Sequence, residues 1–292
     1  MTGSRMPNLF GSVSRQLKIV NVASVPQRSP FRYAGGKTWL VPRIREWLSV
    51  FGGLDKELIE TFAGGGIVTL TAVMENLVGR ATMIELDEDV AAVWETILGG
   101  EAEWLAGEIE RFNLTQENVN SILSESPQSV RERALATIVK NRVTRGGILA
   151  PGVGFVKHGE NGKGLASRWY PKTLKKRILA IDQVRHRIKF IQGDAIPFLK
   201  KHAKREDLVF FIDPPYTKAG RRLYKYSDID HDLLFKLASN LSGNFLMTYD
   251  NEEEIRALAQ EYGFQARTVP MRNTHLTEKL ELLIGKDLDW LS

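Results

Sequence analysis

The strongest structural signal in the sequence is the run Val209-Phe210-Phe211-Ile212, which is followed directly by Asp213-Pro214-Pro215-Tyr216. The first four residues are apolar and favour a buried strand. Two successive prolines cannot continue a helix and donate no hydrogen bonds to a sheet, so the chain leaves the strand as a stiff segment. Ligands bind at the carboxyl edge of open α/β sheets, and we therefore expect a binding site here.

The chemistry of this segment suits an exocyclic amine on a flat ring. The Asp213 carboxylate and the Pro214 carbonyl can each accept a hydrogen from an NH2 group, and Tyr216 can stack on the ring. Pro215 keeps the segment rigid. The alternative is a proline-terminated edge strand with an unrelated aromatic residue, since prolines also occur at sheet edges.

Composition excludes several classes of protein. A chain of 292 residues with 43% hydrophobic and 26% charged residues can bury a full core. The sequence has no cysteine, which excludes disulfides, thiolate metal sites and a cysteine nucleophile, and with it methylation at carbon 5 of cytosine. It shows neither an apolar run long enough to span a membrane nor a secretory leader. We therefore expect a cytoplasmic location, no membrane partner and no metal ligands.

Charge is unevenly distributed along the chain. Between positions 85 and 132 there are twelve acidic and two basic residues. Between positions 140 and 189 there are thirteen basic and two acidic residues, a net charge of +11. A surplus of this size favours a polyanionic partner, because cationic side chains release counterions from phosphates. A solvated helix face with scattered lysines is the alternative.

The elements expected from periodicity form a βαβ unit followed by further strands. A helix opens near 31–37, and residues 58–62 form a strand that enters the turn Ala63-Gly64-Gly65-Gly66. A helix and the strand 81–86 follow. Later strands are expected near 188–192, 209–213, 244–249, 266–271 and 279–284.

These strands lie at both ends of the sequence, with acidic helical and basic glycine-rich segments between them. The pattern predicts an α/β fold with a Rossmann-like, doubly wound mixed sheet. We expect an N-terminal arm at 1–28, a ligand-binding catalytic domain at 29–94 and 185–292, and a mainly helical insertion with a hairpin loop at 95–184.

The glycine turn indicates a nucleotide-like ligand without a pyrophosphate. Glycines after a strand allow close approach of a ligand to the backbone. The dinucleotide pattern G-x-G-x-x-G is incomplete because Thr69 holds its last position, and Gly35-Gly36-Lys37-Thr38 lacks the first glycine and the strand of a P-loop. Glu85 could bind ribose hydroxyls and Asp194 an adenine amine; helix capping is the alternative for both.

Together these motifs resemble the Dam-like (alpha-class) DNA adenine-N6 methyltransferases, which use S-adenosylmethionine, over most of residues 30–285. Phe31 to Lys37 resembles the family's F-x-x-A-G-G-K element, and Thr61 to Gly66 resembles its F-x-G-G-G loop. Many members carry aspartate where this chain has Glu85. The resemblance implies cofactor contacts from Tyr33, Lys37, Phe62, Ala63, Gly64, Gly65, Gly66, Glu85, Asp194 and Asp213. It implies catalysis by Asp213, Pro214, Pro215 and Tyr216.

The same resemblance implies site-specific methylation of a flipped-out adenine in double-stranded DNA, and hence a location on the nucleoid. Asn141-Arg142 resembles the start of a DNA-contacting hairpin, and the insertion corresponds to a target recognition domain. We expect DNA contacts from Arg142, Arg145, Lys157, Arg168 and Lys172. Methylation of RNA adenine or of cytosine N4, and a silent DNA-binding relative, stay open as alternatives. The sequence does not decide whether a separate restriction endonuclease is a partner.

Overall fold

Seven strands form one mixed sheet in the computed structural model, which describes residues 19–33, 35–159, 162–216, 225–226, 228–272 and 278–291. The strands are β1 (Gly53–Glu60), β2 (Val78–Glu85), β3 (Ile188–Gln192), β4 (Leu208–Ile212), β5 (Asn244–Asp250), β6 (Gln265–Arg272) and β7 (Glu278–Gly285). Their order across the sheet is β3-β2-β1-β4-β5-β7-β6. The first five strands pair in parallel, and β7 runs antiparallel to β5 and β6.

This order creates a topological switch point between β1 and β4. The chain moves outward from β1 through β2 to β3 and then returns to place β4 on the other side of β1. The chain therefore leaves the carboxyl ends of β1 and β4 toward α2 (Ile67–Met74) and α10 (His231–Ser239) on opposite faces of the sheet, and such switch points are where open α/β sheets bind ligands. Both the turn at 63–66 and the segment at 213–216 follow these two strands.

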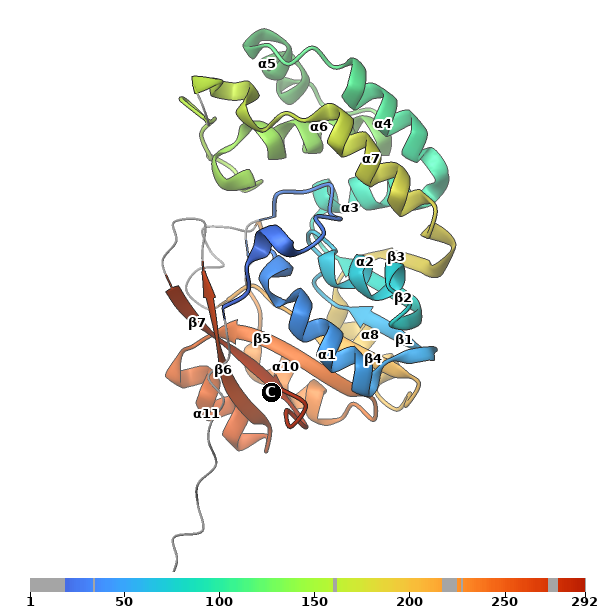
Figure 1. Ribbon diagram of the computed structural model, residues 1–292, viewed down its shortest axis with the longest axis vertical. Helices are drawn as coiled ribbons and strands as arrows, with labels where there is room; N and C mark the ends of the chain where they lie inside the picture. Colours follow the sequence, from blue (N-terminus) through green and yellow to red (C-terminus); the bar gives the residue numbers. More distant parts are fainter. Residues whose placement is uncertain are drawn as a thin grey trace, which may run out of the picture.

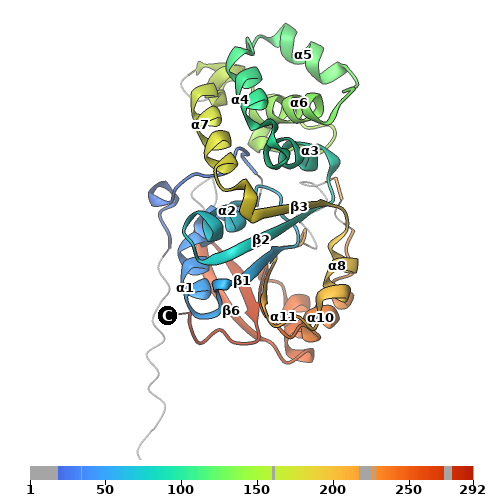
Figure 2. The same cartoon turned by 90° about the vertical axis from the view of Figure 1, so that its right-hand side faces the viewer.

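Helices cover both faces of the sheet (Figures 1 and 2). Alternating side chains of each strand point to opposite faces, as Leu58 and Ile59 of β1 do in two separate core clusters. One face packs against α1 (Val41–Phe51), α2 (Ile67–Met74) and α3 (Glu88–Thr96). The other packs against α8 (Ala195–His202), α10 (His231–Ser239) and α11 (Glu253–Glu261). The predicted doubly wound mixed sheet is confirmed.

Several predicted boundaries differ from the structure. The first helix does not open at 31–37; a 3₁₀ turn begins at Lys37 and α1 begins at Val41, next to Pro42 in its first turn. β1 begins at Gly53 rather than at residue 58, because its amino end also pairs with β2 and the loop before β4. These differences lie at element ends, where propensity alone sets boundaries poorly.

The helices between β2 and β3 gather at one end of the molecule, above the sheet in Figure 1. They are α4 (Ala102–Arg111), α5 (Gln116–Ser124), α6 (Val130–Val143) and α7 (Pro171–Asp182). α3 packs against α6 and α4 against α7. One apolar cluster runs from the sheet through α3 into these helices. The proposed boundary at residue 95 therefore falls within α3 and divides a shared core.

The amino-terminal segment contacts α6 and α7 through residues 29–32. Residues 1–18 of the expected arm fall outside the described part, and residues 19–28 contain only the 3₁₀ turn Val22–Ser24. Among the described residues, no helix has the length and apolar character needed to cross a bilayer.

A buried asparagine joins this segment to α6. Asn141 is fully buried, accepts from the Arg32 amide at 2.9 Å and donates to the carbonyls of Arg32 at 3.0 Å and Gly147 at 2.7 Å. A β-carbon on Gly147 would lie 2.1 Å from the Arg32 carbonyl oxygen, so this position requires glycine. The side chain therefore fixes the segment that leads to Tyr33.

We predict that Asn141→Ala destabilises the protein. It leaves the buried Gly147 carbonyl and the partly buried amide and carbonyl of Arg32 without their partner, and we expect a loss of about 2–4 kcal/mol in the free energy of unfolding. Urea unfolding measures this loss. Asn120→Ala, at an exposed position of α5, is the control and should change stability by less than about 0.5 kcal/mol. Equal effects of the two changes would contradict this role.

Candidate active site

Three acidic residues converge at the carboxyl edge of the parallel strands. Glu60 ends β1, Glu85 ends β2 and Asp213 follows β4 directly. Since these strands are parallel neighbours in the order β2-β1-β4, their ends meet at one edge of the sheet. The site is therefore built around the switch point.

The Asp213 carboxylate is held by two donors from distant parts of the chain. The Lys37 ammonium lies 2.7 Å from Oδ2, and the Thr248 hydroxyl of β5 donates to Oδ1 at 2.5 Å. The Asp213 side chain is 18% exposed. Because a carboxylate offers about four acceptor positions, each oxygen can still accept one further hydrogen bond.

Lys37 keeps its charge although it is buried, with a side chain 4% exposed. Burial lowers its pKa, but the charges of Asp213, Glu281 and Asp250 raise it by more, so the net pKa lies above the ordinary value. The ammonium also donates to the Gly35 carbonyl at 2.9 Å and lies 5.1 Å from the centre of the Tyr216 ring. Lys37 was predicted to contact a cofactor; here it contacts the acid of the Asp-Pro-Pro-Tyr segment.

Tyr216 is held at both its ring and its hydroxyl. The hydroxyl donates to Glu281 Oε2 at 2.9 Å, and the ring stacks on Tyr249 with centroids 6.0 Å apart. Burial and the charges of Asp213 and Glu281 raise the pKa of Tyr216 well above its ordinary value, so the phenol stays protonated. Pro214 is buried and Pro215 partly buried, which keeps the intervening backbone rigid.

The glycine turn requires its glycines. Gly64 and Gly66 have φ angles of 46° and 62°, where other residues are strained. A β-carbon on Gly64 would lie 2.5 Å from the Tyr33 ring, and one on Gly66 would lie 2.7 Å from Met83. A β-carbon on Gly65 would lie 3.1 Å from Tyr33. Tyr33 therefore packs on the turn and fixes its shape.

Hydrogen bonds hold the turn against β2 and α3. The Ala63 amide donates to the Ile84 carbonyl at 3.0 Å, and Trp94 Nε1 donates to the Gly64 carbonyl at 2.9 Å. Phe62 is partly buried and packs on the face covered by α8, α10 and α11. The turn is thus bonded to β2 and α3, and Phe62 before it packs on the opposite face of the sheet.

Glu85 closes the other side of the turn. Its carboxylate accepts from the Gly64 amide at 2.7 Å and from the Asp87 amide at 2.9 Å. Burial raises the pKa of Glu85 to about 7. Hydroxyl groups of a bound sugar would supply donors to this desolvated carboxylate. Asp194, by contrast, is exposed and caps α8 by accepting from the Ile196 amide at 2.9 Å.

Glu60 is the most deeply placed of the three acids. It is 3% exposed and accepts from the Thr69 amide at 2.9 Å. Burial raises the pKa of Glu60 to about 7, hydrogen bonds from Thr69 oppose this shift, and the Asp213 charge adds to it. The pKa values of Lys37 and Glu281 respond to the same Asp213 charge. Among the described residues, this acidic cluster contains three carboxyl groups, Glu60, Asp213 and Glu281, and the Lys37 ammonium. The surplus of carboxyl groups favours a cationic ligand.

Comparison with protein-family models matches residues 33–272 to the D12 class N6 adenine-specific DNA methyltransferase family. The chain belongs to this family. The matched range contains the glycine turn, both strand-end acids and the Asp-Pro-Pro-Tyr segment. This methyltransferase uses S-adenosylmethionine as its methyl donor, and the glycine turn, Glu85 and the acidic cluster fit a ligand that carries a ribose and a sulfonium cation.

Three solved structures with methyltransferase titles align with most of this chain at low sequence identity. A candidate RNA methyltransferase from Pyrococcus horikoshii aligns with 90% of this chain and 92% of its own, at 11% identity and a TM-score of 0.42. A methyltransferase from Geobacter sulfurreducens aligns over 88% and 82%, at 12% identity and a TM-score of 0.39. An rRNA methylase from Streptococcus thermophilus aligns over 84% and 94%, at 8% identity and a TM-score of 0.35. A search of curated proteins found no match.

Arg142 does not occupy the position expected of a DNA contact in this methyltransferase. It is 5% exposed and donates to the Pro30 carbonyl. Burial, and then the charge of Arg177, lower the pKa of Arg142 to about 10. Arg177 in turn donates to the Ser29 carbonyl at 3.1 Å. Since its guanidinium ties α6 to the 29–33 segment, the expectation for Arg142 is corrected to a structural role.

The other basic candidates lie on or beside the expected hairpin. Thr144 and Phe155 form an antiparallel bridge, so residues 145–154 make a hairpin-like loop. Arg145, Lys157 and Lys172 are exposed, and Arg168 is partly buried. Trp169 packs against Phe112 with ring centroids 5.7 Å apart, whereas Tyr170 is exposed.

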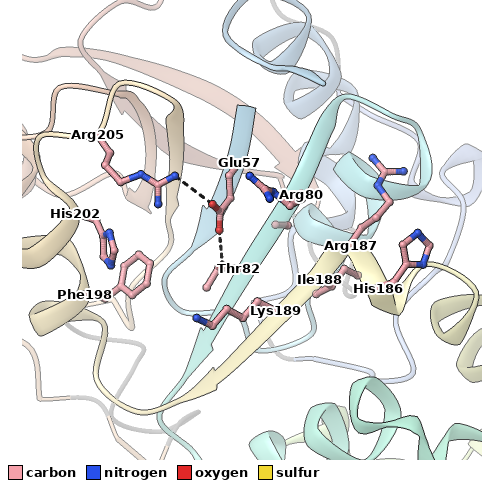
Figure 3. A pocket seen from close by; sticks show the side chains of 11 residues that line it. Glu57, Arg80, Thr82, His186, Arg187, Ile188, Lys189, Phe198, His202 and Arg205 are labelled. Atoms are coloured by element: carbon pink, nitrogen blue, oxygen red, sulfur yellow. Dashed lines mark hydrogen bonds and ion pairs between the residues drawn. The ribbon is translucent and has the colours of Figure 1, made fainter. Parts of the chain in front are cut away.

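A cavity elsewhere on the molecule does not belong to this site. It measures about 400 Å³ and lies at the amino ends of β1, β2 and β3, beside α8 (Figure 3). Glu57 on its wall accepts from Thr82 and pairs with Arg205. Ligands of parallel sheets bind at the opposite edge. Within the described residues, no group of three acidic or histidine side chains is arranged to hold a metal ion.

The sequence analysis did not identify two residues that make contacts in the site. Thr248 and Glu281 lie in β5 and β7, 35 and 65 residues beyond the groups to which they bond. Within β7, Glu281 is the first residue of a buried run that is otherwise apolar or glycine. A buried acid at such a position is the one feature that could have indicated it.

We predict that Glu60→Gln stabilises the ligand-free protein at pH 8 but not at pH 5. Because burial raises the pKa of Glu60 from its ordinary value of 4.5 to about 7, the folded state holds a proton that the unfolded chain has released. The free energy of unfolding therefore falls as the pH rises from about 4.5 to about 7. A neutral amide avoids that loss, and the expected gain at pH 8 is on the order of 2 kcal/mol.

Urea unfolding at both pH values measures this difference. Glu254→Gln, at an exposed position of α11, is the control and should show no such dependence. An equal stability change from Glu60→Gln at pH 5 and pH 8 would contradict the assignment.

Proposed function

We propose that this methyltransferase transfers the methyl group of S-adenosylmethionine to N6 of an adenine in double-stranded DNA. The observation that carries the proposal is the Asp213 carboxylate, fixed by Lys37 and Thr248 beside the rigid Pro214 carbonyl. Two fixed acceptors at a cofactor-binding sheet edge suit an amine with two hydrogens. The family match to residues 33–272 supports adenine in DNA as the substrate.

The chain's own groups would prepare the nitrogen for attack. The donor supplies an electrophilic methyl group on a sulfonium. The N6 lone pair of adenine is delocalised into the purine, so the amine is a poor nucleophile. Hydrogen bonds to Asp213 and to the Pro214 carbonyl favour a pyramidal nitrogen whose lone pair points at the methyl group. The negative charge of Asp213 would also stabilise the positive charge that develops on N6. As the methyl–sulfur bond breaks, S-adenosylhomocysteine would be the leaving group, and N6 would then lose one proton to solvent. Alignment of the reacting atoms supplies much of the remaining gain.

A base in a duplex cannot reach this edge of the sheet, so the target would be flipped out of the helix. Tyr216 then lies beside Asp213 to stack on the extruded ring. The helices α4 to α7 and the hairpin at 145–154 form the target recognition domain in this proposal. Arg145, Lys157, Arg168 and Lys172 supply contacts to the DNA, and Arg142 supports them from within. No observation favours a restriction endonuclease as a partner, and we propose none.

We predict that Asp213→Ala abolishes methylation while cofactor binding persists. Its loss removes an acceptor whose contact strengthens in the transition state, so the single-turnover rate should fall by about a hundredfold or more. Transfer of tritium from labelled S-adenosylmethionine into duplex DNA measures the rate, and isothermal titration measures cofactor binding, expected within about fivefold of the wild type.

The same assay tests the substrate. Label recovered from wild-type reactions as N6-methyladenine in DNA supports the proposal. Label in RNA adenine, in cytosine N4 or in protein would overturn the substrate assignment. Thermal stabilisation by S-adenosylmethionine without any transfer would indicate a silent relative.

We further predict that the exposed basic residues contribute to DNA affinity through phosphates. Each of Arg145→Ala, Lys157→Ala and Lys172→Ala should weaken binding to all duplex sequences alike and reduce the slope of log K against log salt by about 1. Fluorescence anisotropy over a range of salt concentrations measures both. Lys236→Ala, at an exposed position of α10, is the control; an identical slope for all four variants would contradict the contacts.

A further inference from the structure

We propose that Glu281 is a positioning residue for methyl transfer. Its carboxylate accepts a hydrogen bond from the Tyr216 hydroxyl and so fixes the ring against which the target base stacks. This inference rests on the proposed function. It goes beyond it by giving a role to a carboxylate from β7, outside both sequence motifs of the site.

Glu281 is placed firmly enough for this role. It is 7% exposed, and its Oε2 lies 2.9 Å from the Tyr216 hydroxyl. Its backbone is paired on both sides, opposite Asp250 of β5 and Val269 of β6. The residues that follow it in β7 are buried. A side chain held in the interior of a sheet can define the position of a group in a loop.

Tyr216 is also contacted by the Thr248 hydroxyl and by two groups at its ring. Its neighbours Tyr249 and Lys37 contact the ring, with Tyr249 inclined by 25° and the Lys37 ammonium 5.1 Å from the ring centre. A hydrogen bond from the protonated phenol to a fixed carboxylate adds a directional constraint on the ring, and Lys37 links the same ring to Asp213.

A second role for Glu281 would be electrostatic. Its charge is one of those that hold the pKa of Lys37 above the ordinary value. The two roles predict different responses to substitution. A glutamine keeps an oxygen that can accept the Tyr216 hydroxyl and loses the charge, whereas a leucine loses both. Of the two roles, we assign to Glu281 that of accepting the hydrogen bond from Tyr216.

The test is a double-mutant cycle on the single-turnover rate of DNA methylation, at saturating S-adenosylmethionine and duplex DNA. We expect Glu281→Leu and Tyr216→Phe each to lower the rate by about tenfold, the scale of a hydrogen bond to a charged group. The double variant should be no slower than either single variant, because both changes break one contact. Glu281→Gln should retain at least about a third of the wild-type rate, and cofactor affinity should be unchanged throughout.

Glu278→Leu, at an exposed position of the same strand, is the matched control and should keep the wild-type rate. Losses from Glu281→Leu and Tyr216→Phe that multiply in the double variant would overturn the inference. A loss for Glu281→Gln equal to that for Glu281→Leu would also overturn it and would assign the residue to charge balance. If Glu281→Leu does not fold, as judged by thermal melting, Glu281→Gln and Tyr216→Phe still decide: equal tenfold losses contradict the proposal.

The wild-type reaction separates this inference from the proposed function. Absence of label in DNA with the wild-type protein would refute the function itself. Efficient labelling by the wild type with multiplicative losses in the cycle would refute only the role of Glu281.

Discussion

The ion pair between Lys37 and Asp213 is the interaction on which the site depends. A buried ammonium and a nearly buried carboxylate lie 2.7 Å apart, and either one alone would be costly to desolvate. Lys37 comes from the segment before α1, and Asp213 comes from the end of β4, so the pair joins both sides of the switch point. It fixes one carboxylate oxygen and leaves acceptor capacity on both for a substrate amine.

The rest of the architecture serves to place this pair. The parallel strands bring Glu60, Glu85 and Asp213 to one edge, and the glycines of the turn leave room there for the Tyr33 ring. The segment at 29–33 links the turn to the helices above the sheet through Asn141, Arg142 and Arg177. In the proposed function, DNA docked on those helices would be connected to the Tyr33 ring on the glycine turn through hydrogen bonds from these side chains to the main chain of the 29–33 segment.

Sequence reasoning predicted the sheet, the glycine turn and Asp213, because strand periodicity, consecutive glycines and consecutive prolines are strong local signals. It did not find Thr248 or Glu281, since contacts between residues 35 and 65 positions apart depend on strand order and register. It assigned Arg142 to DNA because composition reveals charge but not burial, and a carbonyl of the amino-terminal segment turned out to be its partner. Element ends were misplaced where pairing with a neighbouring strand, rather than propensity, set the boundary.

A crystal structure with S-adenosylhomocysteine bound would show whether the Asp213 carboxylate held by Lys37 lies beside the reacting sulfur, and it needs no knowledge of the DNA target. The account predicts that the ribose contacts Glu85, that the ligand follows the turn at 63–66, and that its sulfur lies within roughly 7 Å of the Asp213 carboxylate, the span of one hydrogen bond and one reacting contact. Lys37 should remain on Asp213. A sulfur atom on the far side of Tyr216, or a ligand bound away from the glycine turn, would contradict the account.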